Sequence, residues 1–325
     1  MAIIDNPRNF FNTKLYTGNS GTQAITGVGF APNIVWLKRR DAYAGWKQFD
    51  TVRGVNKPMA TNSSNSQGSD TNMLTAFGSD GFTLGSSTDV NNNTSPNVSW
   101  NWIEKAGVCD IVSFTGNGSA RTISHSLGSI PTFFVVKSIS NSTSWACYHQ
   151  SQGATKIAGL FNDQSAPESN ANFFNNTEPT SSVFSVGSDN TLNGNGRTFI
   201  AYLFGDTSMS KMGSYIGNGN ADGTFVPLNF SPAMILVKCT SASNENWMMV
   251  DNKRIGFNTK NEQLFPNTPD DEETNTEVNF LSNGFKLLRD NSRMNGTNAT
   301  YMYLAFAENS FVTSTTNGSI PTPAR

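Results

Sequence analysis

The chain has 325 residues, more than one average domain, and its length predicts two or three. Its 22 Lys and Arg nearly balance 24 Asp and Glu, which gives a net charge of −2 at pH 7. This balance excludes the strongly basic surface of proteins that bind nucleic acid or anionic membranes, so we expect neither as a partner.

The composition predicts an all-β fold. Only 14% of the residues are charged, whereas 41 are Asn and 28 are Gly. These residues are poor helix formers and are frequent in tight turns. The mean hydropathy of −0.38 would suit a disordered chain, but 23 Phe, 7 Tyr and 6 Trp indicate a packed core.

The first 13 residues precede the first repeated motif, and we expect an N-terminal arm (residues 1–13). Phe10 and Phe11 are its candidate docking residues. The arm carries Asp5 and Arg8 and lacks the apolar stretch of a signal peptide. No apolar run in the chain is long enough to span a bilayer, so we expect no membrane insertion.

Three motifs recur in the same order, which predicts a tandem triplication. The first combines an aromatic residue with a Gly-Asn pair, at Tyr16-Thr17-Gly18-Asn19, Phe114-Thr115-Gly116-Asn117 and Tyr215-Ile216-Gly217-Asn218. The second is a proline followed six positions later by a lysine, with four apolar residues between them, at Pro32–Lys38, Pro131–Lys137 and Pro232–Lys238. The third is an aromatic strand that ends at Trp102, Phe204 and Phe306.

Each motif predicts a strand of a particular kind. A short apolar run entered by proline and left through a charge is typical of a strand that is buried on both faces. The closing strand alternates, as in Val98, Trp100 and Trp102, which is typical of a strand with one buried face. Asn-Gly pairs such as Asn193-Gly194 predict hairpin turns.

We count six or seven strands per module, which predicts three tandem β-sandwich modules with a jelly-roll-like topology. The predicted boundaries are 14–107, 108–208 and 209–308, followed by an extended C-terminal tail at 309–325. The linkers between modules are short, so neighbouring modules should contact each other. The odd set Cys109, Cys147 and Cys239 predicts free thiols in a reducing compartment.

A tryptophan with an Asp–Arg pair is the strongest candidate for a binding site. It occurs as Trp46, Asp50 and Arg53, and again as Trp247, Asp251 and Arg254. The functional interpretation is a glycan or partner site, in which the ring stacks on a sugar and the charges bind hydroxyl groups. The structural interpretation is a tryptophan at the core edge with an ion pair that fixes a turn. The second module keeps Trp145 but has His149 and Gln152 in place of the pair, which favours the structural interpretation.

No motif for catalysis, a cofactor or a metal is present, and we expect no enzymatic activity. The two histidines, His125 and His149, have no motif partner. The acidic run Asp270–Glu273 has two interpretations, a Ca²⁺-binding loop or a solvated loop. Irregular ligand spacing and its presence in one module favour the solvated loop.

Several motifs of the first module resemble virion structural proteins of marine bacteriophages such as cyanophages, which are described as tail-fibre-like. The resemblance rests on Asn6-Pro7, Phe11-Asn12-Thr13, Tyr16-Thr17-Gly18-Asn19, Gly29-Phe30, Trp36-Leu37-Lys38 and Ser79-Asp80-Gly81-Phe82. It implies a non-enzymatic virion protein, a tail fibre or host-attachment component, made in the bacterial cytoplasm. Its implied partners are other virion proteins, a host glycan or receptor, and further copies of the chain, as in the trimers common among phage fibres.

Two alternatives stay open at this point. The first is a capsid decoration, knob or tail-hub protein that binds only other virion proteins. The second is an enzyme that acts on polysaccharide, which would need paired carboxylates in a cleft. No pair of Asp or Glu recurs between the modules to indicate such an enzyme.

Overall fold

The computed structural model describes residues 6–254, 258, 260–310, 312–315 and 318–321. Their secondary structure is almost entirely antiparallel β, so the predicted all-β fold class is confirmed. The helices of this part of the chain are short: η1 (Pro7–Asn9), α1 (Thr88–Asn91), α2 (Ala171–Phe174) and α3 (Asn190–Asn193). None of its helices is long and apolar enough to cross a bilayer.

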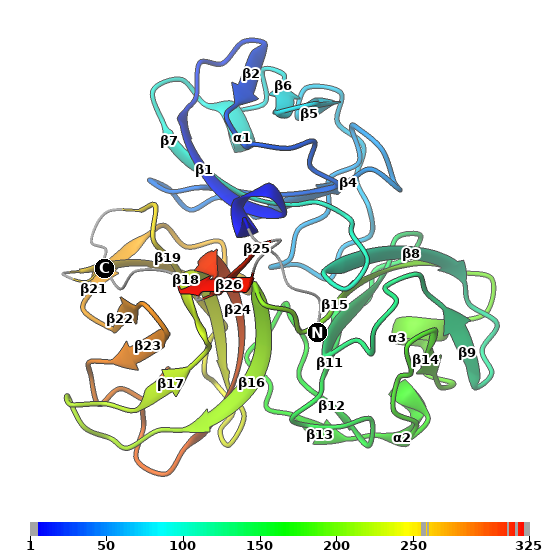
Figure 1. The fold of residues 1–325 in the computed structure, drawn as a ribbon. Helices are drawn as coiled ribbons and strands as arrows, with labels where there is room; N and C mark the ends of the chain where they lie inside the picture. Colours follow the sequence, from blue (N-terminus) through cyan, green and yellow to red (C-terminus); the bar gives the residue numbers. More distant parts are fainter. Residues whose placement is uncertain (1–5, 255–257, 259, 311, 316–317, 322–325) are drawn as a thin grey trace.

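The strands fall into three lobes around a common centre (Figure 1). Lobe 1 contains β1 (Phe11–Thr17), β2 (Gln23–Thr26), β3 (Ile34–Arg39), β4 (Lys47–Asp50), β5 (Leu74–Gly78), β6 (Gly81–Leu84) and β7 (Pro96–Trp102). Lobe 2 contains β8 (Cys109–Thr115), β9 (Arg121–Ser124), β10 (Phe133–Ser138), β11 (Ala146–His149), β12 (Lys156–Ile157), β13 (Glu168–Ser169), β14 (Val183–Val186) and β15 (Thr198–Phe204). Lobe 3 contains β16 (Ser210–Ile216), β17 (Phe225–Pro227), β18 (Phe230–Cys239), β19 (Met248–Asp251), β20 (Asn261–Leu264), β21 (Glu273–Asn275), β22 (Val278–Leu281), β23 (Gly284–Leu287) and β24 (Thr300–Ser310).

The main sheets of the three lobes have the same strand order. They run β1-β7-β3-β4 in lobe 1 and β8-β15-β10-β11 in lobe 2. Lobe 3 repeats this order as β16-β24-β18-β19 and extends it with β20 and β21. The register also agrees, because Ile34, Phe133 and Met234 lie opposite Trp102, Phe204 and Phe306. A common origin of the lobes, the module boundaries and the jelly-roll-like topology stay predictions.

The inner strands of each main sheet are buried on both faces, which explains the continuous apolar runs in the sequence. In β3, Val35 and Leu37 join the core inside lobe 1, between the main sheet and the small sheet β2-β6-β5. Ile34 and Trp36 alternate with them and face the centre of the molecule. The sheet therefore completes its burial only against the other two lobes.

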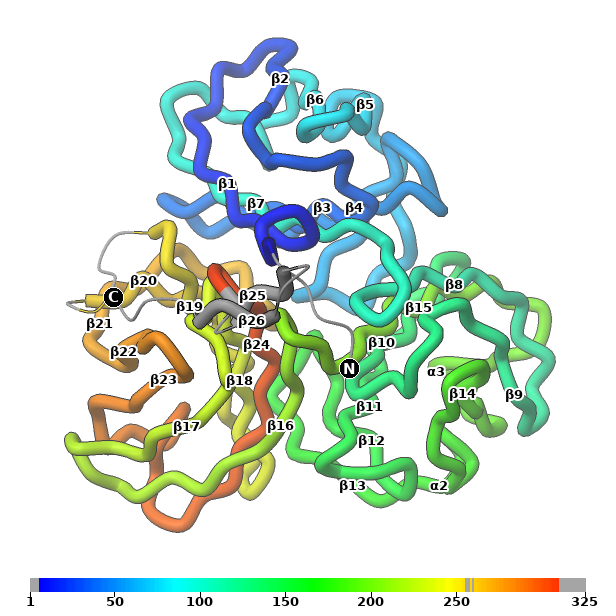
Figure 2. Tube along the Cα trace, in the orientation of Figure 1, coloured from blue at the N-terminus to red at the C-terminus, as the bar shows by residue number. Residues whose placement is uncertain are grey.

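The closing strands bring three aromatic rings together at the centre. The ring centroids of Trp102, Phe204 and Phe306 lie 5.6–6.1 Å apart. A cavity of about 50 Å³ beside them has an almost wholly apolar lining. Figure 2 shows the chain passing from lobe 1 to lobe 2, and from lobe 2 to lobe 3, near this centre.

The N-terminal segment differs from the predicted N-terminal arm with docking residues. Phe11 is the first residue of β1, lies opposite Trp102 and is 1% exposed. Its ring centroid is 5.1 Å from that of Phe306. Phe10 is half-buried and packs against the same core. The prediction that Phe11 is a docking residue is therefore wrong, because its side chain is part of the interior. Residues 1–5 of the predicted arm lie outside the described residues.

The C-terminal segment is more regular than the predicted extended tail. The strand β24 continues to Ser310, beyond the predicted module boundary at 308. It is followed by a two-stranded hairpin of β25 (Val312–Thr315) and β26 (Gly318–Pro321).

Candidate functional site

The repeated tryptophans lie at the contacts between the lobes. Each precedes the strand next to the Pro-to-Lys strand, and its backbone N–H donates to an asparagine side chain of its own lobe. The three N···O distances are 3.0 Å for Trp46 to Asn62, 2.8 Å for Trp145 to Asn162 and 2.9 Å for Trp247 to Asn267. This bond fixes the direction in which each ring leaves its lobe.

The indole N–H of each tryptophan crosses to another lobe. Trp46 donates to the carbonyls of Phe265 and Thr268 in lobe 3, both at 3.0 Å. Trp145 donates to Ala60 at 3.1 Å and Ser63 at 3.0 Å in lobe 1. Trp247 donates to Leu160 in lobe 2 at 3.2 Å. Lobe 1 thus donates to lobe 3, lobe 2 donates to lobe 1 and lobe 3 donates to lobe 2, so the contacts close a ring of three lobes.

The predicted Asp–Arg pairs occupy the same contacts. Arg53 Nε lies 2.5 Å from Asp50 Oδ2, and Arg254 Nε lies 2.7 Å from Asp251 Oδ2. All four side chains are at most 2% exposed. Because a buried charge is costly unless it is paired and hydrogen-bonded, these pairs need the further partners that the neighbouring lobes supply.

An aromatic donor from another lobe completes each pair. The hydroxyl of Tyr202 in lobe 2 donates to Asp50 at 2.6 Å, and the indole of Trp100 in lobe 1 donates to Asp251 at 3.1 Å. Burial raises the pKa of Tyr202 well above its usual value, which keeps its hydroxyl protonated as a donor.

The contact between lobes 2 and 3 uses histidine instead. His149 is fully buried, and its Nε2 lies 3.2 Å from the carbonyl oxygen of Tyr303 in lobe 3. Its Nδ1 accepts from the backbone N–H of Ser151 at 3.1 Å, so Nε2 carries the proton of a neutral ring. Burial lowers the pKa of His149 to about 4. Gln152 is half-buried and does not take the place of Arg53.

The lysine that ends each Pro-to-Lys motif is buried as well. The ammonium groups of Lys38 and Lys137 donate across the contacts to Pro269 O at 3.2 Å and Ser64 O at 3.1 Å. Burial lowers the pKa of both lysines to about 8 and lowers that of Lys238. The motif predicts a charge at the strand exit, but its role as an interlobe donor could not be inferred from spacing.

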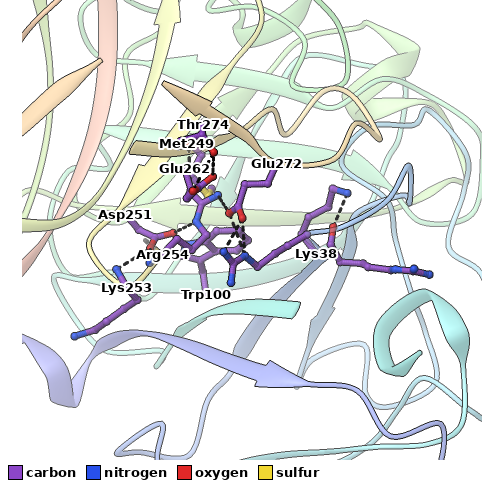
Figure 3. Close-up of polar contacts among 11 residues, drawn as sticks. Lys38, Trp100, Met249, Asp251, Lys253, Arg254, Glu262, Glu272 and Thr274 are labelled. Carbon is purple, nitrogen blue, oxygen red and sulfur yellow. Dashed lines mark hydrogen bonds and ion pairs between the residues drawn. The ribbon is translucent and has the colours of Figure 1, made fainter. Parts of the chain in front are cut away.

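The acidic run contributes one more interlobe contact through Glu272, which Figure 3 shows beside Arg254. Glu272 lies 2.6 Å from Arg40 of lobe 1 and 3.0 Å from Arg254 of its own lobe. Its side chain is only 10% exposed, so the prediction of a solvated loop is wrong for Glu272. Within the described residues, no group of three or more His, Cys, Asp or Glu is placed to hold a metal ion.

The glycan interpretation of the repeated residues is wrong, because their side chains are inside the molecule. The six residues concerned are Trp46, Asp50, Arg53, Trp247, Asp251 and Arg254, and each is at most 5% exposed. None can stack on a sugar or bind its hydroxyl groups from solution. Their arrangement instead joins the three lobes.

A second repeated set, which the sequence analysis did not single out, holds the loops of each lobe. Asn91 donates to Gly85 O and Gly21 O, both at 2.7 Å, and its Oδ1 accepts from the N–H of Asn19. Asn193 and Asn295 make the corresponding bonds to Asn117 and Asn218. The Gly-Asn motif is thus one half of an asparagine clamp, and the spacing of 102 between the three clamp asparagines was the signal that could have identified it.

One family model matches the chain, over residues 6–310, and it is described as a domain of unknown function (DUF7483). The match spans all three lobes as one unit. No curated protein matches the chain.

Proposed function

The chain belongs to the DUF7483 family, and from this premise we propose that it is a non-enzymatic structural protein of a phage virion, exposed as a tail fibre or host-attachment component. The sequence resemblance to tail-fibre-like proteins supports the phage assignment. The observation that carries the structural role is the closed ring of interlobe contacts through Trp46, Trp145 and Trp247.

The ring makes the three lobes one rigid block. Its tryptophan, ion-pair and lysine contacts are buried and hydrogen-bonded, so relative movement of the lobes would leave polar groups unsatisfied in the interior. A rigid block suits a protein that transmits force or holds position on a particle. An enzyme with a mobile cleft between domains would instead need lobes that can move relative to each other.

The exterior suits exposure to solvent. Large apolar side chains that are exposed number five among the described residues and come from all three lobes: Tyr43, Val52, Ile130, Ile216 and Phe225. With a net charge of −2, the surface offers polar loops for recognition without a strong field of either sign.

Immunogold labelling of purified virions tests the proposal. Antibodies raised against the recombinant chain should place gold on the tail or its fibres. Gold over capsid vertices would replace this function by a capsid decoration protein, and virions without gold would contradict a virion function altogether.

A further inference from the structure

The contact between lobes 2 and 3 differs from the other two interlobe contacts in its polar links. Trp247 donates its indole N–H to one carbonyl, whereas each of the other two interlobe tryptophans donates to two. Lys238 donates to Cys239 O within its own lobe at 3.0 Å, whereas the lysines of the other two motifs donate across a contact. Among the described residues, no ion pair crosses from lobe 2 to lobe 3. In place of an Asp–Arg pair, this contact has the hydrogen bond between His149 and the carbonyl of Tyr303.

The surroundings of His149 fit only a neutral ring. Its Nε2 faces the carbonyl oxygen of Tyr303 at 3.2 Å, and its Nδ1 accepts from the backbone N–H of Ser151 at 3.1 Å. A second proton would have to be placed on Nδ1, against that N–H, and its charge would be fully buried. Because a buried charge without a partner is costly, the ring can bind this proton readily only after the lobes separate and water reaches it.

No charged side chain compensates a charge on this ring. Within the described residues, no ion pair or hydrogen bond joins His149 to an ionised group. On the facing strand β24, burial raises the pKa of Tyr303 to about 12, which keeps its phenol neutral. Lys137 on β10 donates into lobe 1, and Lys211 on β16 donates within lobe 3. Glu308 on β24 is paired with a lysine and an arginine away from the ring.

Asp206, in the linker between lobes 2 and 3, responds to acid in the opposite sense. Its carboxylate accepts from the backbone N–H of Met212 at 2.9 Å and from the hydroxyl of Thr132 at 3.0 Å. Burial raises the pKa of Asp206, so its carboxyl binds a proton more readily while it is buried than in water. Acid therefore favours the closed contact at Asp206, whereas it favours the open contact at His149.

We propose that the contact between lobes 2 and 3 is acid-sensitive, so that these lobes separate on protonation of His149 while the other two interlobe contacts stay closed. Those two contacts contain Asp–Arg pairs in place of the histidine. Free aspartate and arginine both keep their charges at pH 5, so mild acid does not discharge such pairs. The inference goes beyond the proposed function, which requires only the ring that is closed at neutral pH.

Deuterium exchange of the interlobe indole N–H groups, followed by NMR on the intact chain, tests the proposal. Trp46, Trp145 and Trp247 are fully buried, and each reports on a different interlobe contact. We expect the protection of the Trp247 indole, relative to free tryptophan at the same pH, to fall about 20-fold between pH 7 and pH 5. The protection of the other two indoles should fall by less than about threefold.

Two variants assign the effect to one ring. His149→Gln keeps a donor and an acceptor but cannot become charged, so the protection of Trp247 should then change by less than about twofold over the same interval. His125→Gln is the matched control in the same lobe, because the hydrogen bonds of His125 stay within lobe 2. It should behave as the unaltered chain does.

Three results would overturn the proposal: an unchanged protection of Trp247, an equal fall at all three indoles, or the same fall of Trp247 in His149→Gln. An equal fall would mean that acid loosens the whole molecule. The three indoles are compared within the unaltered chain, so the first two results decide the matter even where a variant does not fold.

Discussion

At the scale of single residues, the interlobe tryptophans differ from the other tryptophans in their polar atom. Trp145 donates its indole N–H to two carbonyls of lobe 1, whereas the indole N–H of Trp36 has no hydrogen-bond partner in the described part of the chain. Both rings are in the core, at 0% and 6% exposure. A comparison of Trp145 with Trp36 therefore separates the contribution of the indole hydrogen bonds to stability from the contribution of ring burial.

We expect Trp145→Phe to lower the free energy of unfolding by about 1–3 kcal/mol more than Trp36→Phe, because it removes the indole donor to the carbonyl of Ser63 and leaves the carbonyl of Ala60 with only the backbone N–H of Ser63. Urea unfolding followed by circular dichroism measures both losses. Equal losses in the two variants would mean that the interlobe hydrogen bonds contribute nothing beyond ring burial.

The buried histidine predicts a loss of stability in acid. The pKa of His149 is about 4 in the folded chain and near 6.5 in the unfolded chain. Its contribution is therefore complete above pH 6.5 and is lost as the pH falls from 6.5 towards 4, by about 3 kcal/mol in all. A protonated Nδ1 would also face the N–H of Ser151, one donor against another.

Urea unfolding at pH 7 and pH 4.5 measures this loss. Carboxylates add their own acid dependence, so the informative quantity is the difference between variants. His149→Gln should lose less stability over this interval than the unaltered chain; the matched control is His125→Gln, which alters the half-buried histidine whose hydrogen bonds stay within lobe 2. An unchanged loss in His149→Gln would show that this ring does not set the acid limit.

Sequence spacing identified the residues of the interlobe contacts but not their partners. Trp46, Asp50 and Arg53 recur at a constant offset, and the exchange of the Asp–Arg pair for His149 and Gln152 correctly favoured a structural role. Their acceptors, such as Phe265 O and Thr268 O, are backbone atoms more than 200 positions away. Backbone acceptors leave no trace in residue identity, so no motif could have predicted them.

At the scale of the elements, the glycine of the aromatic-Gly-Asn motif sets the approach between two segments of each lobe. A Cβ on Gly18 would lie 2.1 Å from the carbonyl oxygen of Asn92. Gly116 and Gly217 are equally close to the carbonyls of Gly194 and Gly296. The motif therefore requires glycine because backbone occupies the place of a side chain.

We expect Gly18→Ala to destabilise the chain by about 1–3 kcal/mol or more, since the end of β1 must move away from the Asn91 clamp. Gly21→Ala is the matched control in the same loop, because its Cβ would meet its nearest atom at an ordinary 3.6 Å. Thermal unfolding compares the two variants. A Tm for Gly18→Ala equal to that of Gly21→Ala would contradict the close approach.

Strand prediction succeeded where apolar runs were long and failed where the lobes differ. The expected buried strand after Pro32 is β3, and the expected closing strand is β7. The strands β20 and β21 were missed, because the polar residues of Asn261–Leu264 and Glu273–Asn275 carry no apolar alternation.

At the scale of the whole molecule, the lobes depend on one another for burial. The face of lobe 1 that carries Trp36, Trp46, Trp100 and Trp102 is covered only by the other lobes. We expect the intact chain to unfold in a single calorimetric transition, and a fragment of residues 1–107 to bind a hydrophobic dye and to lack a cooperative transition. A cooperative transition of the isolated fragment would show that lobe 1 is an independent domain.

The order in which the lobes donate their tryptophan hydrogen bonds also has a consequence for synthesis of the chain. Trp145 and Trp247 reach back to lobes that have already left the ribosome, whereas Trp46 must wait for Phe265 and Thr268. At about 5–20 residues per second, roughly 10–40 s pass between the synthesis of Trp46 and that of Thr268. During that interval, Trp46 and Trp100 lack their partners in lobe 3 on the nascent chain. Premature termination before residue 268 should therefore yield aggregates, and the need for chaperone protection should end abruptly once the last lobe closes the ring.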